Sequence, residues 1–263
     1  MPHDYIQRLL ASWRDDTGLV ASPPIGSHPE GFWAEIECAF LNTYQARWQY
    51  IVDSLGRGFA QGKTMLWRRA DLDRAGGIEA LGKEVAEDAA ATKIVRDAGL
   101  KVRLIDRPLA QPLGRRGACE IWNRQLRWAR LRRASFFIYF LPEILSGALL
   151  PIAVVGVLAK AFDLPLAVCL AGFGILWYGS EMLLAVAAGW HVSLLYPVYG
   201  FVRDLMLPVL FFGALRGNDF VWRGNEMQVE RMQPRLMAKV RPRMHELAAG
   251  SRRRLRALRA RMS

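Results

Sequence analysis

The sequence predicts an α/β domain at residues 1–133, an α-helical membrane region at residues 134–215 and a basic cytoplasmic tail at residues 216–263. Helix-like and strand-like segments alternate in the first part, as they do in α/β layer domains. Nearly all of the long uncharged stretches lie between Ala134 and Leu215. With 52% hydrophobic residues, the chain is too apolar for a typical soluble protein and too polar for one that lies entirely in a membrane.

The first elements are read from apolar spacing and turn residues. Residues 1–33 predict one amphipathic helix, with apolar residues at helical spacing from Tyr5 to Trp13, followed by a loop in ASPPIGSHPEG. A second helix is expected from Phe32 to about Val52. GFAQGKTMLWRR suggests a strand, and ADLDRAGG suggests a short helix that glycines close.

The rest of the first part continues the alternation. EVAEDAAATKIVRDAG predicts a helix, because it is rich in alanine, acidic early, basic late and stopped by Gly99. LKVRLID is typical of a buried strand, and RPLAQPLGRRG of a loop. A further helix is expected from about Ala118 through Arg133.

Three apolar stretches follow. LSGALLPIAVVGVLA with its Phe-rich approach, and LPLAVCLAGFGILWYGSEMLLAVAAGW, are long enough to cross a bilayer. The third stretch carries Arg203 and Asp204 in its middle, where charges are costly unless they face protein or water. Basic residues flank the region on both sides, which indicates cytoplasmic ends. We therefore predict two full crossings, a re-entrant or interfacial third segment, and a pair between Glu181 and Arg203.

The formal net charge of +12 favours anionic lipid headgroups or phosphorylated substrates as partners. No nucleic-acid partner is expected, since no aromatic or fold signature of such proteins accompanies the charge. The end SRRRLRALRARMS predicts a helix that binds a bilayer with anionic headgroups. Three separated cysteines and four scattered histidines show no zinc, redox or disulfide spacing.

Two segments imitate ligand-binding motifs. GRGFAQGKT lacks the first glycine of a nucleotide P-loop, because Arg57 stands at that position. A strand in which the Gly62 backbone lies close to a neighbour is the preferred interpretation. Asp71 and Asp73 in DLD resemble an acidic pair for Mg²⁺ or Mn²⁺. They also suit the start of a short helix, where carboxylates favour the dipole, and this second interpretation is preferred.

Two other motifs carry candidate chemistry. In AEDAAATK, a carboxylate of Glu87 or Asp88 among small alanines could accept a proton from an attacking hydroxyl, although a solvated acidic helix start also fits. In RQLRW, Arg124 and Arg127 share a helix face and suit phosphate oxygens, and Trp128 offers a flat surface for a sugar or acyl chain. A basic helix that binds lipid headgroups is the alternative.

Together these motifs give the chain a recognisable order. SPPIGSHPEGFWAEIECAFLN, FAQGKTMLWRRADLDRAGGIEALG, AEDAAATK and RQLRW, followed by RDLMLPVLFF and VWRGN, resemble the ceramide glucosyltransferase family, glycosyltransferase family 21, which is related to family 2. The resemblance implies that residues 1–133 are the C-terminal part of a GT-A-type catalytic domain. It also implies an integral membrane protein of a bacterial-type inner membrane or its equivalent, with the soluble part and the tail facing the cytoplasm.

The resemblance also implies roles for individual residues. Asp88, with Glu87 beside it, would be the catalytic base that deprotonates a lipid hydroxyl. The hydroxyl would attack a UDP-hexose, most simply UDP-glucose, with inversion. Four residues of the second motif would steady the diphosphate and close the site: Arg124, Gln125, Arg127 and Trp128. Ceramide is the leading acceptor, and a hopanoid lipid is the alternative within the family.

The sequence departs from the family pattern in one respect. The strand–helix half that cradles uridine, the DxD motif that holds Mg²⁺ or Mn²⁺, and a preceding membrane span have no counterpart in these 263 residues. We therefore expect no metal site in this chain and no sugar transfer by the chain as written. A non-catalytic membrane remnant that binds lipid or a partner is the second hypothesis.

Overall fold

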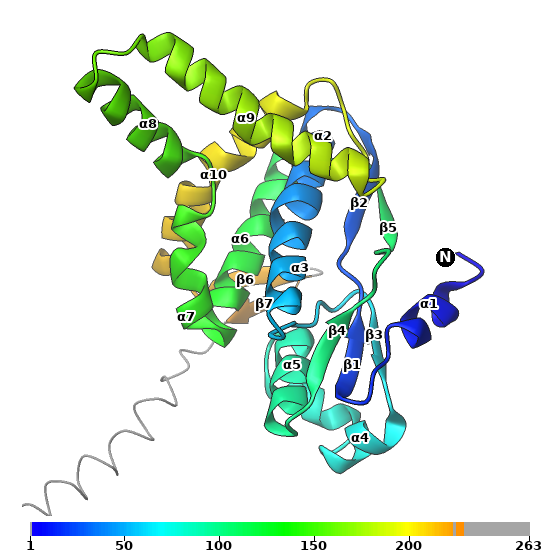
Figure 1. Ribbon diagram of the computed structural model, residues 1–263. Helices are drawn as coiled ribbons and strands as arrows, with labels where there is room; N and C mark the ends of the chain where they lie inside the picture. Colours follow the sequence, from blue (N-terminus) through cyan, green and yellow to red (C-terminus); the bar gives the residue numbers. More distant parts are fainter. Residues whose placement is uncertain (1, 223–224, 229–263) are drawn as a thin grey trace, which may run out of the picture.

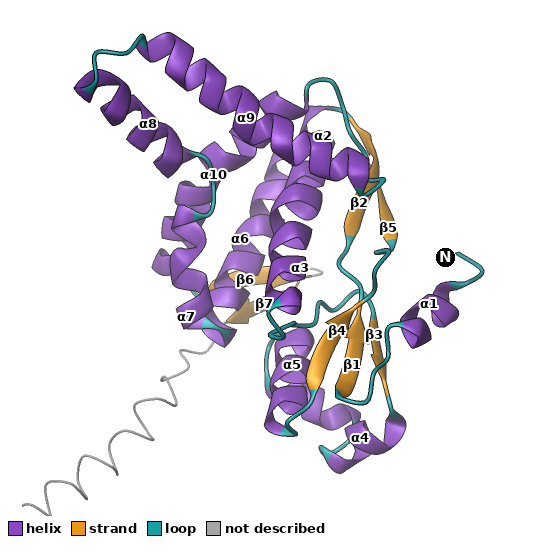
Figure 2. Ribbon diagram, in the orientation of Figure 1, coloured by secondary structure: helices purple, strands orange, loops and turns teal. Residues whose placement is uncertain are grey.

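The computed structural model describes residues 2–222 and 225–228, which form an α/β part joined to a helical part (Figures 1 and 2). Strands β1 to β5 lie on one side of several long helices, and a helical hairpin projects from one end of the molecule (Figure 2). This division agrees with the mixed composition predicted from the sequence. The arginine-rich end predicted as a lipid-binding helix, residues 251–263, lies outside the described residues.

Strand β1 (Thr17–Ala21) is the centre of a three-stranded sheet, with β3 (Met65–Trp67) antiparallel on one side and β4 (Lys101–Leu104) parallel on the other. Every residue of β1 is buried. The sequence analysis predicts no strand between the first helix and the loop ASPPIGSHPEG, and it misses β1 because a strand buried on both faces shows no alternation of polar and apolar residues. The strand predicted in LKVRLID is confirmed. The one predicted in GFAQGKTMLWRR is limited to β3.

A second, two-stranded sheet pairs β2 (Ile25–Glu30) with β5 (Ala110–Arg115) in parallel. The sequence predicts loops in both segments, and both predictions are wrong. Each strand contains a proline, Pro29 or Pro112, which argues against a central strand. In a two-stranded sheet, however, each strand has a free edge where a missing N–H costs no ladder hydrogen bond.

A continuous helix runs through α2 (Phe32–Ala39), the π-helical segment η1 (Phe40–Ala46) and α3 (Arg47–Ser54), which confirms the predicted helix and adds a π-helical turn. The π segment presents buried polar side chains. Asn42 accepts the Gly26 N–H at 2.7 Å and donates to the Gly26 carbonyl at 3.1 Å. This amide therefore satisfies both backbone groups of a buried residue in β2.

Shorter helices complete the α/β part. Helix α1 (Tyr5–Ala11), α4 (Arg69–Arg74) and α5 (Glu87–Asp97) confirm predicted helices, and a 3₁₀ segment, η2 (Ile78–Lys83), precedes α5. Three glycines end α4 and α5 in the left-handed region, as expected from the sequence: Gly76 with φ 106°, Gly77 with φ 71° and Gly99 with φ 73°.

The helical part begins with α6 (Ala118–Ser135), which confirms the predicted helix of the arginine-rich segment. After it come α7 (Phe137–Phe140), a 3₁₀ segment η3 (Leu141–Leu145), α8 (Leu149–Ala161), α9 (Leu166–Ala187) and α10 (Tyr196–Arg216). A short hairpin, β6 (Asp219–Trp222) and β7 (Asn225–Gln228), follows α10.

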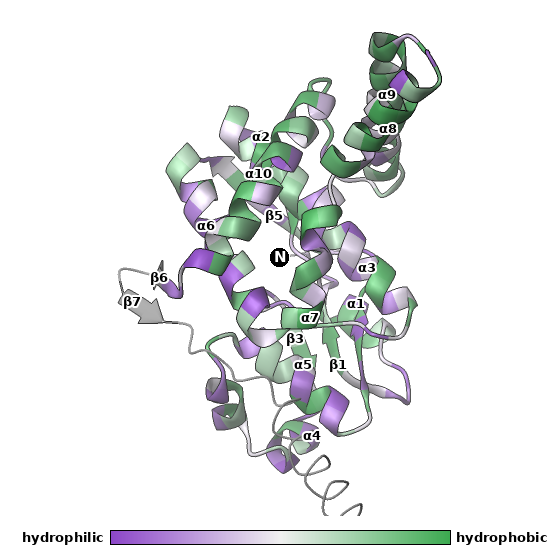
Figure 3. Cartoon of the chain, turned by 90° about the vertical axis from the view of Figure 1, so that its left-hand side faces the viewer, coloured by the Kyte–Doolittle hydropathy of each residue, from purple (hydrophilic) through white to green (hydrophobic). Residues whose placement is uncertain are grey.

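Three helical segments of the described chain are long and apolar enough to cross a membrane: residues Phe137–Ala161, Leu166–Ala187 and Tyr196–Arg216. Helices α8 and α9 form the projecting hairpin (Figure 1), and apolar residues dominate them (Figure 3). Helix α10 instead packs lengthwise against α2 and α6 and is unbroken despite Pro208. The two-crossing topology stays a prediction, with α10 as the interfacial segment.

A buried ion cluster joins the membrane helices to the α/β part. Arg203 and Asp204 are 0% exposed and Glu181 is 2% exposed. The Arg203 guanidinium lies 3.0 Å from Glu181, 2.7 Å from Asp204 and 2.9 Å from the Thr43 hydroxyl. Arg47 of α3 reaches Glu181 at 2.6 Å. The predicted pair between Glu181 and Arg203 is confirmed.

Replacing Arg203 with methionine should leave the buried carboxylates of Glu181 and Asp204 without their shared cation. Removal of one partner of a buried ion pair typically costs about 3–5 kcal/mol. We expect a large fall in the temperature of thermal unfolding, measured in detergent. Arg216→Met, at the exposed end of the same helix, is the control and should change this temperature little. Equal unfolding temperatures for the two variants would contradict this account.

Candidate active site

Asp88 lies in the first turn of α5 and is partly buried. Its carboxylate accepts the Gly62 N–H at 3.2 Å and the Ala89 N–H at 2.8 Å. Burial, and then repulsion by Glu87, raise the pKa of Asp88 above its ordinary value. A carboxylate with a raised pKa is a stronger base than an exposed one, which suits proton abstraction.

Glu87 is exposed and stands over the turn that precedes β3. A Cβ atom added at Gly62 would lie only 2.5 Å from the Glu87 carboxylate and 3.9 Å from that of Asp88. Gly62 therefore lies close to a neighbouring element, as predicted, and that element is the start of α5. The predicted strand is wrong at this position, because Gly62 belongs to a turn. The glycine leaves room for both carboxylates at one end of the helix.

The end of α6 lies within electrostatic reach of Asp88. Burial alone would lower the pKa of Arg132, but Glu143 and, more weakly, Asp88 raise it above its ordinary value. Glu143 of η3 accepts two hydrogen bonds from Arg132, at 2.6 and 2.8 Å. This bidentate pair fixes the guanidinium between α6 and the start of the membrane region.

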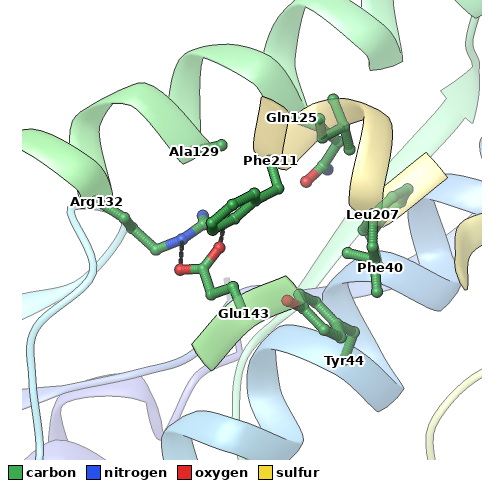
Figure 4. A pocket seen from close by; sticks show the side chains of 9 residues that line it. Phe40, Tyr44, Gln125, Ala129, Arg132, Glu143, Leu207 and Phe211 are labelled. Atoms are coloured by element: carbon green, nitrogen blue, oxygen red, sulfur yellow. Dashed lines mark hydrogen bonds and ion pairs between the residues drawn. The ribbon is translucent and has the colours of Figure 1, made fainter. Parts of the chain in front are cut away.

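A small cavity of about 10 Å³ lies beside this pair, between α6, η1 and α10 (Figure 4). The volume corresponds to roughly one water molecule. Gln125 projects into it, accepts a hydrogen bond from Gln45 at 3.1 Å, and is 2% exposed. Its Nε2 has no partner among the residues that the structure describes. Tyr44 lines the same cavity, and burial raises the pKa of its hydroxyl to about 12.

Arg124 and Trp128 of RQLRW do not line this cavity. Arg124 forms ion pairs with Glu37 and with Glu120. Glu37 is fully buried in α2, and burial raises its pKa against the opposing effect of Arg124. Trp128 packs against a cluster of Cys38, Leu41 and Leu113. Arg124 and Trp128 therefore attach α6 to α2 and β5.

Arg127 differs from its neighbours. It is partly buried, and no ion pair or hydrogen bond of its side chain occurs within residues 2–222 and 225–228. Burial, and then the positive charge of Arg124, lower its pKa from the ordinary value. An uncompensated, half-buried guanidinium is placed to accept an anionic group.

The structure brings the predicted site residues only partly together. Asp88 lies within electrostatic reach of Arg132, near the end of α6 and after the second motif, and within the described residues no hydrogen bond or ion pair joins it to RQLRW. The motif's own side chains divide between two faces of the helix. Sequence reasoning missed Glu37, Glu143 and Arg132. The only signals were an acidic residue within an apolar helix, FWAEIECAF, and another within the apolar approach to the first span.

The DLD segment does not suit a metal. Asp71 pairs with Arg74 at 2.6 Å, and Asp73 pairs with Arg69 at 3.5 Å, on the exposed helix α4. No group of three histidine, cysteine, aspartate or glutamate residues that could hold a metal ion occurs in the described part of the chain. The interpretation of DLD as part of a short helix agrees with α4.

Comparison with known proteins assigns the chain to a family. The family model for "Glycosyl transferase family 21" matches residues 1–234. The chain belongs to glycosyl transferase family 21. This family 21 chain is also 25% identical over 223 residues to Ceramide glucosyltransferase 1 of Caenorhabditis elegans, covering 80% of the chain and 46% of that protein. The chain thus spans about half the length of this relative. No solved structure matches it.

The raised pKa of Asp88 has a consequence for stability. Between the unfolded value of 3.8 and the higher folded value, the folded state holds a proton that the unfolded chain releases. The contribution of Asp88 to the free energy of unfolding therefore falls as the pH rises through this range. Asp88→Asn should unfold at the temperature of the wild type near pH 4 and at a higher temperature at pH 7.

Thermal unfolding in detergent across this pH range measures the difference. Asp97→Asn changes an exposed carboxylate at the other end of α5 and is the matched control, for which we expect no such divergence. If Asp88→Asn were less stable than the wild type at pH 7, the carboxylate would be stabilising the fold and this interpretation would be wrong.

Proposed function

We propose that this chain carries the acceptor-activating part of an inverting membrane glycosyltransferase. The enzyme moves a hexose, glucose in the simplest case, from a UDP-sugar to a lipid hydroxyl, with ceramide as the leading acceptor. One observation carries the proposal: a carboxylate with a raised pKa lies within electrostatic reach of the helix that presents an unpaired guanidinium, beside helices long enough to span a membrane. Family membership and the printed name of the worm relative support it.

The reaction assigns each residue a distinct task. Asp88 takes the proton from the acceptor hydroxyl as the oxygen attacks the anomeric carbon from the face opposite the diphosphate. The bond from the anomeric carbon to the UDP oxygen breaks, and the configuration inverts. Positive charge develops at the sugar in such displacements. Arg127 offsets the negative charge that accumulates on the leaving diphosphate, while Glu87 helps to keep the Asp88 pKa raised.

The remaining motif residues act by position. Arg124 and Trp128 fix α6 against α2 and β5, so that Arg127 is presented at a constant place. Gln125 fixes the opposite face through Gln45. A divalent cation, Mg²⁺ or Mn²⁺, is expected of the family. Since Asp71 and Asp73 are engaged by arginines, no step of this proposal passes through a metal held by the described residues.

Two alternatives remain distinct from ceramide glucosylation. A hopanoid acceptor would use the same Asp88 chemistry with a different lipid. A non-catalytic remnant would keep the fold and its lipid contacts without transfer. The name of the worm relative bears on the choice between ceramide and a hopanoid, because it specifies ceramide for a protein of which this chain matches 46%.

The purified chain of 263 residues should not transfer glucose from UDP-glucose to ceramide in mixed micelles. We propose this because the described residues provide no group of three histidine, cysteine, aspartate or glutamate side chains that could hold the metal expected of the family. A longer product of the same gene, read from any in-frame upstream start, is assayed in parallel. It should show turnover if it supplies the strand–helix half that cradles uridine and carries the DxD motif. Transfer at an ordinary enzymatic rate by the chain alone would refute the proposal of inactivity. Inactivity of both forms favours the remnant.

In an active form, Asp88→Asn should lower kcat by about 10²–10⁴-fold, the usual contribution of a general base. Arg127→Ala should lower kcat/KM by roughly 10²-fold, as expected for one charged donor to a developing anion. Arg115→Ala changes an exposed arginine outside α6 and serves as the control. Initial rates with radiolabelled UDP-glucose measure these effects. Unchanged rates for Asp88→Asn would remove this residue from the mechanism.

A further inference from the structure

A large cleft lies apart from the candidate active site. Its volume is about 730 Å³, in the range of small-molecule sites. The C-terminal end of α9, the face of α3, the start of β2 and the loop before β5 enclose it, and neither Asp88 nor any residue of RQLRW lines it. The proposed sugar transfer therefore gives this cleft no role.

One side of the cleft belongs to the membrane region. Leu184, Ala187 and Ala188 from the last turns of a candidate span line it, followed by Trp190. Because α8 and α9 form a hairpin that leaves and returns to the α/β part (Figure 1), this end of α9 lies where the hairpin meets the domain. Tryptophan is frequent at the level of lipid headgroups. Ile51 of α3 lines the cleft opposite and is 42% exposed.

The other side of the cleft is polar and carries both signs of charge. Asp106 and Arg107 are adjacent, both exposed, and their side chains form no ion pair or hydrogen bond within the described residues. Arg47, which also lines the cleft, is already paired with Glu181. An unpaired anion beside an unpaired cation complements a ligand that itself carries both charges.

Two buried donor groups belong to residues that line the cleft. The hydroxyl oxygen of Ser27 and the indole nitrogen of Trp190 are buried, and neither has a hydrogen-bond partner in the part of the chain that the structure describes. Both residues line the cleft. These two atoms are shielded from solvent, so a ligand in the cleft would reach them only after a local rearrangement.

We propose that the cleft binds a zwitterionic glycerophospholipid of the surrounding bilayer. Its acyl chains lie along Leu184, Ala187 and Ile51. Its phosphate faces Arg107, and its ammonium group faces Asp106. The site is separate from Asp88 and RQLRW, and its occupancy holds the end of α9 against the sheet.

The test uses the full purified chain, stripped of lipid in detergent, and native mass spectrometry with added lipids of identical acyl chains. Phosphatidylethanolamine should bind at least fivefold more than phosphatidylglycerol, and diacylglycerol should not bind specifically. Glycerol 3-phosphate, which carries the phosphate without acyl chains, should not compete. Equal binding of diacylglycerol, or full competition by glycerol 3-phosphate, would overturn the assignment to a phospholipid.

Three variants locate the site. Ala187→Trp should fill the cleft and abolish the binding of added phospholipid. Val186→Trp changes an exposed neighbour that does not line the cleft and should leave phospholipid binding unchanged. Arg107→Gln should lower retention of both phospholipids several-fold, and Arg115→Gln should not. Asp106→Asn should remove the preference for phosphatidylethanolamine over phosphatidylglycerol without abolishing phospholipid binding. If Ala187→Trp, with an unchanged unfolding temperature, retained lipid like the wild type, the cleft would not be the binding site.

Discussion

The buried ion cluster around Arg203 is the constraint on which the rest of the structure depends. Buried charges are costly, and their desolvation is offset only when every charge is paired. Arg203 meets Glu181 of α9, Asp204 of its own helix and Thr43 of the π segment, so that three separate elements share one guanidinium. Few other arrangements would satisfy all of these groups. The cluster therefore determines how the membrane helices meet the long α2–α3 helix, and through α10 it determines where α6 lies.

The sequence predicts the helices of this protein well and the strands poorly, for identifiable reasons. Helices α5 and α6 carry their own periodicity, charges and stop signals, which neighbours do not alter. Strand β1 is buried on both faces and shows no alternation, and β2 and β5 contain prolines, which strands tolerate at a free edge. The partner of a strand lies far away in the chain, and no local sequence pattern indicates which segment it is.

The candidate site shows the same limit at the level of side chains. The sequence indicates Asp88 as a carboxylate at a helix start, and the structure adds the burial that raises its pKa. The sequence could not indicate that Arg124 would pair with Glu37, a residue 87 positions earlier, because that pairing exists only after α2 and α6 pack together. A motif such as RQLRW therefore names a helix of interest without separating the residues that hold it from those that are free to bind.

The arginines beside the apolar run can now be separated by their contacts. Of the five arginines between positions 124 and 133, four are engaged by the protein itself: Arg124 by Glu37, Arg130 by the carbonyl of Asp219, Arg132 by Glu143, and Arg133 by the carbonyls of Leu215 and Gly217. These contacts tie α6 to α2, to η3 and to the chain after α10. A basic helix that served only to attract lipid headgroups would have no need of such internal partners. Within the described residues, Arg127 alone in this set forms no ion pair or hydrogen bond through its side chain, so the proposed phosphate-binding role of the segment rests on this one guanidinium.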